Sequence, residues 1–121
     1  MTTLGRTISV KGELRSSEDL MVEGRVEGPV FCETGSLVLG ASAEVRGDII
    51  GRDVTVFGRV RGKIVASEYV DLRSESAVTG QILTKRFILD DGAEFQGRVE
   101  PQHLEAALRV ARFQQKQREA G

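Results

Sequence analysis

Few residues in this 121-residue chain combine the types and the spacing that catalysis or metal binding requires. His103 is the only histidine and Cys32 the only cysteine. Neither therefore has a partner with which to form a zinc site, an intramolecular disulfide or a nucleophile–base pair. Asp90-Asp91-Gly92 has the composition of one turn of a calcium-binding solenoid, but such sites need the turn to recur and it occurs once. The sequence thus predicts no catalytic residue, metal, cofactor or small-molecule substrate.

Charge and composition also exclude several kinds of partner. The 17 Lys and Arg residues nearly balance the 18 Asp and Glu residues, and only 5% of residues are aromatic. Nucleic-acid binding is not expected, because it needs an excess of positive charge and aromatic side chains on which bases stack. No stretch approaches the roughly 20 apolar residues of a membrane span. With a single cysteine and no signal peptide, the sequence predicts a cytoplasmic protein.

What the chain does contain is a repeat, with an apolar residue two positions before and two positions after a glycine. The glycines of its six copies are 16, 19, 15, 18 and 17 residues apart. The six copies are Val10-Lys-Gly12-Glu-Leu14, Val26-Glu-Gly28-Pro-Val30, Val45-Arg-Gly47-Asp-Ile49, Val60-Arg-Gly62-Lys-Ile64, Val78-Thr-Gly80-Gln-Ile82 and Phe95-Gln-Gly97-Arg-Val99. At such glycines we expect a bend, a positive φ or a close approach between backbones.

A second marker gives the same period. Pairs of apolar residues two positions apart recur in steps of 17, 17, 16 and 17 at Leu20/Val22, Leu37/Leu39, Val54/Val56, Val70/Leu72 and Phe87/Leu89. Alternation of this kind, rich in β-branched residues, is typical of short half-buried strands. One unit cannot bury its own apolar residues, but units stacked about 4.8 Å apart can. The sequence therefore predicts an all-β fold, a parallel β-helix (β-solenoid) of about six coils.

The two markers divide the chain into three parts. Residues 1–8 form a short flexible N-terminal arm, 9–100 the β-helix domain, and 101–121 a C-terminal tail that is either helical or disordered. Leu104, Ala107, Leu108 and Ala111 would share one face of a tail helix that begins near Pro101.

Residues 1–8 contain no recognisable cap for the stacked strands, and the tail helix either caps the last coil, recruits a partner or remains mobile. Uncovered strand edges pair readily, so we expect the chain to associate with itself through the ends of the solenoid. The predicted contacts at the C-terminal coil are Phe87, Leu89, Phe95 and Val99. Those at the N-terminal coil are Val10, Leu14, Leu20 and Val22.

Basic residues recur on the outward side of the central coils. Arg46 and Arg61 occupy equivalent outward positions, and Arg59 and Lys63 flank Arg61. The sequence thus predicts a small basic surface patch on one wall. An ordinary solvated face is the simpler explanation, because Glu44 and Asp48 are close in sequence.

The chain resembles the bactofilins, a family of bacterial polymer-forming cytoskeletal proteins. The resemblance covers roughly residues 7–99. It rests on Ile8-Ser-Val10-Lys-Gly12, on Glu18-Asp-Leu-Met-Val-Glu-Gly24-Arg-Val-Glu-Gly28, on the serial Val-x-Gly-x-Ile units, and on Asp91-Gly-Ala-Glu-Phe95-Gln-Gly97. The resemblance implies a right-handed β-helix that assembles without nucleotide into non-polar filaments, which act as a scaffold for cell-shape or cell-envelope factors.

The resemblance also suggests particular contacts. Phe95 matches the family's terminal phenylalanine, which takes part in polymer contacts, although it is equally expected in the core. Many relatives bind the inner face of the cytoplasmic membrane through an N-terminal segment. Residues 1–8 have too little apolar bulk for this, so direct membrane binding is not expected here. The expected partners are the chain itself and proteins at the cell envelope.

Two alternatives belong to other classes. The first is a solenoid that acts as a protein-binding platform, which is compatible with polymerisation. The second is an acyltransferase of the left-handed β-helix type. That fold needs a strict six-residue step and a histidine base on the solenoid wall, whereas here the repeat length varies and His103 lies in the tail.

Overall fold

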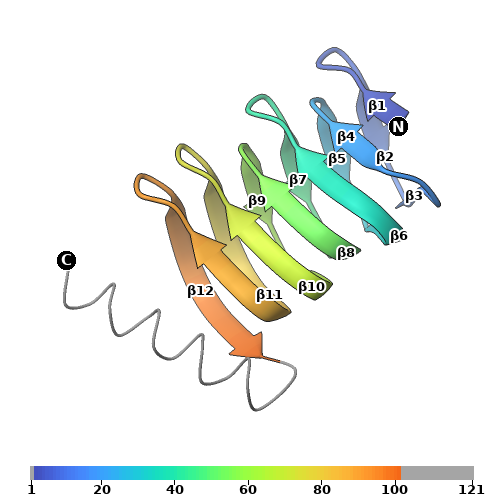
Figure 1. The fold of residues 1–121 in the computed structure, drawn as a ribbon. Coiled ribbons are helices and arrows are strands. Elements are labelled where there is room, and N and C mark those ends of the chain that lie inside the picture. The colour runs from blue at the N-terminus through green and yellow to red at the C-terminus, as the bar shows by residue number, and fades with distance from the viewer. Residues whose placement is uncertain (1, 102–121) are drawn as a thin grey trace.

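The protein is described by a computed structural model that covers residues 2–101. Parallel strands form a single sheet that winds through about six turns (Figure 1). This confirms the predicted all-β parallel β-solenoid, and no helix occurs among residues 2–101. The strands are β1 (Thr2–Leu4), β2 (Ser9–Lys11), β3 (Leu14–Arg15), β4 (Leu20–Val22), β5 (Arg25–Glu27), β6 (Val30–Leu39), β7 (Glu44–Arg46), β8 (Ile49–Val56), β9 (Arg59–Arg61), β10 (Ile64–Leu72), β11 (Ala77–Leu89) and β12 (Glu94–Pro101).

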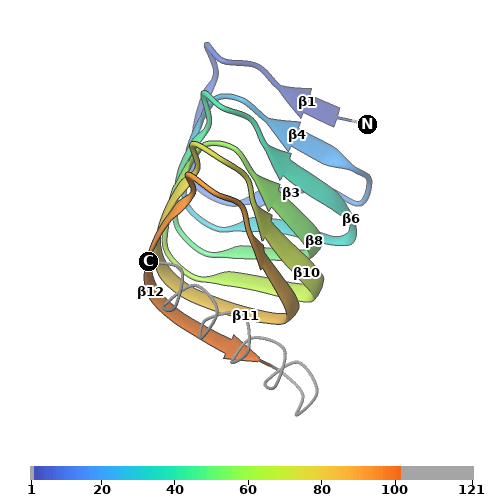
Figure 2. The same ribbon diagram turned by 60° about the vertical axis from the view of Figure 1, so that its left-hand side comes forward.

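Each coil has three faces, here called A, B and C in the order in which the chain passes through them (Figure 2). Equivalent residues of successive coils pair in register and form columns that run along the rod. The inward columns are Leu20, Leu37, Val54, Val70 and Phe87 on face A, Val10, Val26, Val45, Val60, Val78 and Phe95 on face B, and Leu14, Val30, Ile49, Ile64, Ile82 and Val99 on face C.

The core is the set of these inward columns together with a second inward column of face A, which consists of Val22, Leu39, Val56, Leu72 and Leu89. In the central coils their residues are completely buried: Val56, Ile64 and Val70 each have 0% exposure. Apolar residues alternate with exposed ones along the strands because successive side chains on a strand point to opposite sides. Burial of these aliphatic side chains, at about 1.5–3 kcal/mol each, is the main stabilising contribution.

The repeated glycines form the corner between faces B and C. Gly62 has a φ of +143°, and a Cβ atom there would lie 2.2 Å from the carbonyl oxygen of Gly47 in the preceding coil. Two of the roles expected for these glycines, a positive φ and a close backbone approach, are thus both present. The corner also separates the two apolar residues of each repeat, so Val60 lies on face B and Ile64 on face C.

The turns between faces A and B explain much of the varying repeat length. Four residues make this turn at 5–8, 40–43, 73–76 and 90–93, but only two make it at 23–24 and 57–58. The strands before and after the turns stay in register. The extra residues therefore project from the rod without disturbing the core.

Both ends of the predicted domain differ from the sequence-based boundaries. Residues 2–4, assigned to the flexible arm, form β1 and pair with β4 of the second coil. Pro101, assigned to the tail, ends β12 in register with Thr84. A proline is tolerated there because β12 is an edge strand among the described residues. The rest of the predicted tail, including His103, lies outside the described residues.

Candidate assembly surfaces at the ends and exterior of the solenoid

The last coil leaves one side of its strands without a partner. Among the described residues, β12 pairs only with β11, and residues 86–89 of β11 pair only with β10. Phe87 is 8% exposed, while Leu89, Phe95 and Val99 are half-buried against the core. The rings of Phe87 and Phe95 pack with their centroids 5.7 Å apart at an interplanar angle of 58°. The structure thus brings the four predicted C-terminal contact residues together at one end of the rod.

The first coil is open in the same way. Among the described residues, β1, β2 and β3 each pair only with a strand of the second coil. Val10 and Leu14 are half-buried in this coil. Leu20 and Val22 lie instead in the second coil and are 2% and 0% exposed, because β1 covers them. They are therefore core residues rather than end residues, and half-buried Leu4 takes the end position.

Polar contacts surround the apolar centre of the first coil. Arg15 forms an ion pair with Glu13 at 2.9 Å, and this hydrogen bond lowers the pKa of the Glu13 carboxyl. The Thr2 hydroxyl donates a hydrogen bond to the Glu18 carboxylate. The first coil thus has a charged rim around the aliphatic residues Leu4, Val10 and Leu14, whereas the apolar centre of the last coil contains the aromatic pair.

The predicted basic patch lies on the exterior of face B. Arg46 and Arg61 pair in register on β7 and β9, and Arg59 lies on the same strand as Arg61. Lys63 lies past the glycine corner, where its backbone N–H approaches the Asp48 carboxylate at 3.4 Å.

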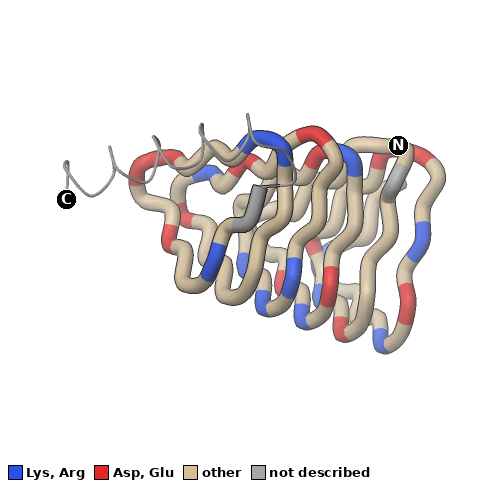
Figure 3. Tube along the Cα trace, turned by 90° about the horizontal axis from the view of Figure 1, so that it is seen from below, with Lys and Arg blue, Asp and Glu red and all other residues tan. Residues whose placement is uncertain are grey.

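Acidic residues border this patch. Glu44 pairs in register with Arg59 and forms an ion pair with Arg25 at 3.3 Å. Both signs of charge are interspersed along the rod (Figure 3). A shallow groove of about 400 Å³ crosses this surface. Its lining consists of Glu44, Val45, Arg46, Arg59, Val60, Arg61, Ala77, Thr79 and Glu94.

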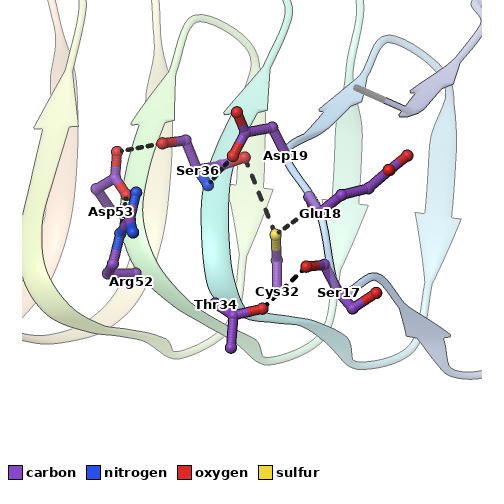
Figure 4. Close-up of polar contacts among 8 residues, drawn as sticks. All are labelled: Ser17, Glu18, Asp19, Cys32, Thr34, Ser36, Arg52 and Asp53. Carbon is purple, nitrogen blue, oxygen red and sulfur yellow. Dashed lines mark hydrogen bonds and ion pairs between the residues drawn. The ribbon is translucent and has the colours of Figure 1, made fainter.

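A chain of polar contacts follows the corner between faces C and A (Figure 4). The Ser36 backbone N–H donates to Asp19 at 2.8 Å, and the Ser36 hydroxyl donates to Asp53 at 2.7 Å. Arg52 forms an ion pair with Asp53 at 3.1 Å. Burial raises the pKa of the nearby Cys32 thiol, which donates to the carbonyl oxygen of Glu18.

These contacts have a structural explanation. The strand register shifts between Cys32 and Ser36, and the ladder of backbone hydrogen bonds is interrupted there. Side-chain oxygens take over as hydrogen-bond partners at this point, as buried polar groups require. Within residues 2–101, moreover, no group of three or more His, Cys, Asp or Glu side chains is placed to hold a metal ion.

One exterior feature of face C was not expected from the sequence. Most outward columns mix charged and polar residues, but one carries four large apolar side chains in consecutive coils. We call it the exterior apolar row; it consists of Phe31, Ile50, Val65 and Leu83. The signal was available, because each member directly follows the last apolar residue of a repeat. It was missed because the alternation of apolar and polar residues was assumed to hold at every strand.

Comparison with known proteins identifies the family. A family model described as "Bactofilin: Polymer-forming cytoskeletal" matches residues 2–100. The chain belongs to the bactofilin family. Bactofilin BacO of Myxococcus xanthus (strain DK1622) is 38% identical over 99 residues, which cover 82% of this chain and 78% of BacO. Bactofilin BacP of the same organism is also 38% identical over 99 residues, but the match covers only 41% of BacP. No solved structure matches.

Membership of this family gives the structure a functional setting. Bactofilins are polymer-forming cytoskeletal proteins, which is a structural role. The matched segment begins at residue 2 and so includes β1, the strand that completes the first coil. Within the described residues, no helix has the length and apolar character needed to cross a membrane.

Proposed function

We propose that this bactofilin is a cytoskeletal subunit that assembles end to end, through its first and last coils, into filaments. The observation that carries the proposal is that both end coils combine unpaired strand edges with half-buried apolar side chains. Pairing with a second copy would satisfy the backbone groups of an end coil and complete the burial of residues such as Phe95 and Leu4. Backbone hydrogen bonds and apolar contacts need no bound nucleotide.

We further propose that like ends meet, so that the filament has no polarity. In a contact with two-fold symmetry the same end of both copies is used, residues near the axis face their own counterparts, and strands at the interface run antiparallel. Alternating contacts of two kinds, first coil to first coil and last coil to last coil, then give an open, non-polar chain. The different character of the two ends, aromatic at one and aliphatic with a charged rim at the other, favours this pairing over a mixed contact.

In the cell, such a filament would act as a cytoplasmic scaffold for cell-shape or cell-envelope factors, at or near the inner face of the membrane. The exterior of the rod supports this role, because a filament repeats each surface feature at regular intervals. Partners with weak affinity for one subunit would bind the filament more tightly through several subunits.

Electron microscopy of the purified protein at physiological salt without nucleotide tests assembly. We expect filaments whose subunit repeat matches the length of about six coils. Sedimentation of the same samples over a wide range of concentrations should show polymer at the higher concentrations. A species that stays monomeric throughout would overturn the proposal.

Polarity can be tested by cross-linking single cysteines in a Cys32→Ser background. Gln96 in the last coil and Lys11 in the first lie in the same exterior column of face B. If like ends meet, Q96C alone is linked into dimers by a short bismaleimide. If unlike ends meet, dimers form only between Q96C and K11C. T79C, one coil further in, serves as the control for contacts along the side of the rod.

The second candidate function is a protein-binding platform, and the groove on face B favours it. Small side chains at Ala77 and Thr79 follow the long side chains of Arg59 and Arg61, so the surface is lower there. Guanidinium groups beside such a depression suit an acidic peptide. Binding of a poly-glutamate peptide that is weakened by Arg61→Gln, but not by Arg73→Gln elsewhere on the surface, would support this function. If both changes weaken binding equally, the peptide is attracted by the general charge of the surface and not by the groove.

A further inference from the structure

The exterior columns of the solenoid face water, so a column with four large apolar side chains, the exterior apolar row, is unusual. Its four members pair in register across β6, β8, β10 and β11, and all are half-buried. Arg15 continues the column at one end, with its guanidinium 4.4 Å from the ring centroid of Phe31. No other exterior column in the part of the chain described by the structure has four consecutive large apolar residues. A continuous apolar strip of this kind usually has a partner.

The chain itself leads to this strip. Glu100 follows Leu83 in the same column, and Pro101 is the last described residue. The twenty residues 102–121 therefore begin directly beside one end of the exterior apolar row. We infer that residues 102–121 form an amphipathic helix that packs along the exterior apolar row of the same chain, from the last coil towards the first.

The sequence of this segment suits that role. Four of its six charged residues are spaced four, three and four positions apart, which places them on one side of a helix: Glu105, Arg109, Arg112 and Lys116. The other two, Arg118 and Glu119, lie near the end of the segment, beyond the roughly ten residues that would cover the row. The opposite side would carry the apolar residues Leu104, Ala107, Val110 and Ala111, extended by Leu108 and Phe113. A helix with this division of residues needs an apolar partner, and its alanines allow a close approach to the sheet.

The dimensions also agree. Four residues in consecutive coils span about 14 Å, because neighbouring strands lie about 4.8 Å apart. A helix advances about 1.5 Å per residue, so roughly ten of the twenty residues cover the row. One helical turn of about 5.4 Å is close to the spacing of the coils. Successive turns of the helix would therefore lie over successive coils, opposite Leu83, Val65, Ile50 and Phe31 in turn.

This position has a consequence for assembly. A helix on face C lies along the side of the rod and leaves the strand edges of the last coil open. Docking of the tail within one chain does not require polymerisation. A tail in this position also does not compete with end-to-end contacts.

Limited trypsin digestion of the 121-residue chain tests the inference, because the segment contains Arg109, Arg112, Lys116 and Arg118. We expect slow cleavage in the wild type. Val65→Asn should speed cleavage in the segment about tenfold, the factor expected when the contact of one buried valine is lost. Thr79→Asn, an exterior change on face B, is the matched control and should leave the rate unchanged. Equal cleavage rates in all three proteins would overturn the inference.

A second measurement remains informative if a variant folds poorly. In a Cys32→Ser background, spin labels at Ser67, which is exposed beside the exterior apolar row, and at Gln115 should show one narrow distance distribution. A broad distribution would contradict a docked helix. Dilution of the doubly labelled chain with unlabelled protein distinguishes the occupant. A narrow distance that disappears on dilution would mean that the segment docks on a second copy, and would overturn docking within one chain.

Discussion

Val60 and Phe95 occupy equivalent positions two coils apart, yet one belongs to the core and the other to a surface. Val60 lies between Val45 and Val78 in its column and is 1% exposed. Phe95 has Val78 on one side only, and it remains half-buried although its side chain is larger. Burial in this molecule is therefore decided by the number of neighbouring coils rather than by the apolar character of a residue. The end coils are cores that lack one neighbour, and substitutions should act differently in the two regions.

The largest effect is expected in the central coils. Val56→Asp places a carboxylate where the side chain is completely buried, without a partner for its charge. We expect a loss of more than about 4 kcal/mol in the free energy of unfolding, enough to unfold many domains. Circular dichroism and urea titration would measure it. Thr79→Asp, on the exterior of face B in register with Arg61, is the control and should change stability by less than about 1 kcal/mol.

The glycine corner provides a comparison between an interior coil and the first coil. Gly62→Ala would bring a Cβ atom to 2.2 Å from the carbonyl oxygen of Gly47 at a φ of +143°. We expect it to destabilise the protein by about 3 kcal/mol or more, since strain and overlap add. Gly12→Ala has a φ of +117° but nothing within 4 Å of the added atom, so only the strain of about 1–2 kcal/mol remains. Equal losses in thermal unfolding would show that overlap between coils contributes little.

Phe95→Arg should separate assembly from folding. Phe95 has no coil beyond it among the described residues, and its side chain can reorient towards water. We expect the β-sheet circular dichroism to persist while filaments are lost and at most dimers joined by their first coils remain. Thr79→Asn, on the exterior one coil further in, should keep the filaments. Loss of the circular dichroism signal in Phe95→Arg would instead place this residue with the interior core.

The smallest effects are expected on the exterior of face B. Arg61 lies beside Arg46, so Arg61→Gln removes a repulsion and should stabilise the fold by up to about 0.5 kcal/mol at low salt. Arg25→Gln removes the ion pair with Glu44 and should destabilise it by a similar amount. The effects of both substitutions on the free energy of unfolding should fall towards zero at 1 M salt. Urea titrations at two salt concentrations would show whether the signs are opposite.

The sequence predicted the interior of the solenoid better than its limits. The pairs such as Leu37/Leu39 and the recurring glycines are dictated by stacking, so their period was readable along the chain. The predicted first coil was too short because Leu4 is a single apolar residue, and its role depends on pairing with Val22, 18 residues further along the chain. Periodicity within a strand does not reveal which strand ends up outermost.

The contact surfaces were predictable to a similar extent. The residues of the last coil came from the repeat itself, and they do lie together. Leu20 and Val22 were predicted at the end of the rod but lie one coil further in, because β1 was not predicted from the sequence. The exterior apolar row escaped notice because it breaks the alternation that identified the strands, as at Ile49-Ile50 and Ile64-Val65.

The glycine corner also sets a rule for how the length of this subunit can change. The turns between faces A and B accept either two or four residues, but at the glycine corner each carbonyl oxygen occupies the space that a side chain of the next coil would need. Lengthening the rod therefore requires insertion of a complete coil, in steps of about 4.8 Å. Bactofilin subunits of this design can differ in length only by whole coils, and the spacing of anything attached along their filaments would change in the same discrete steps.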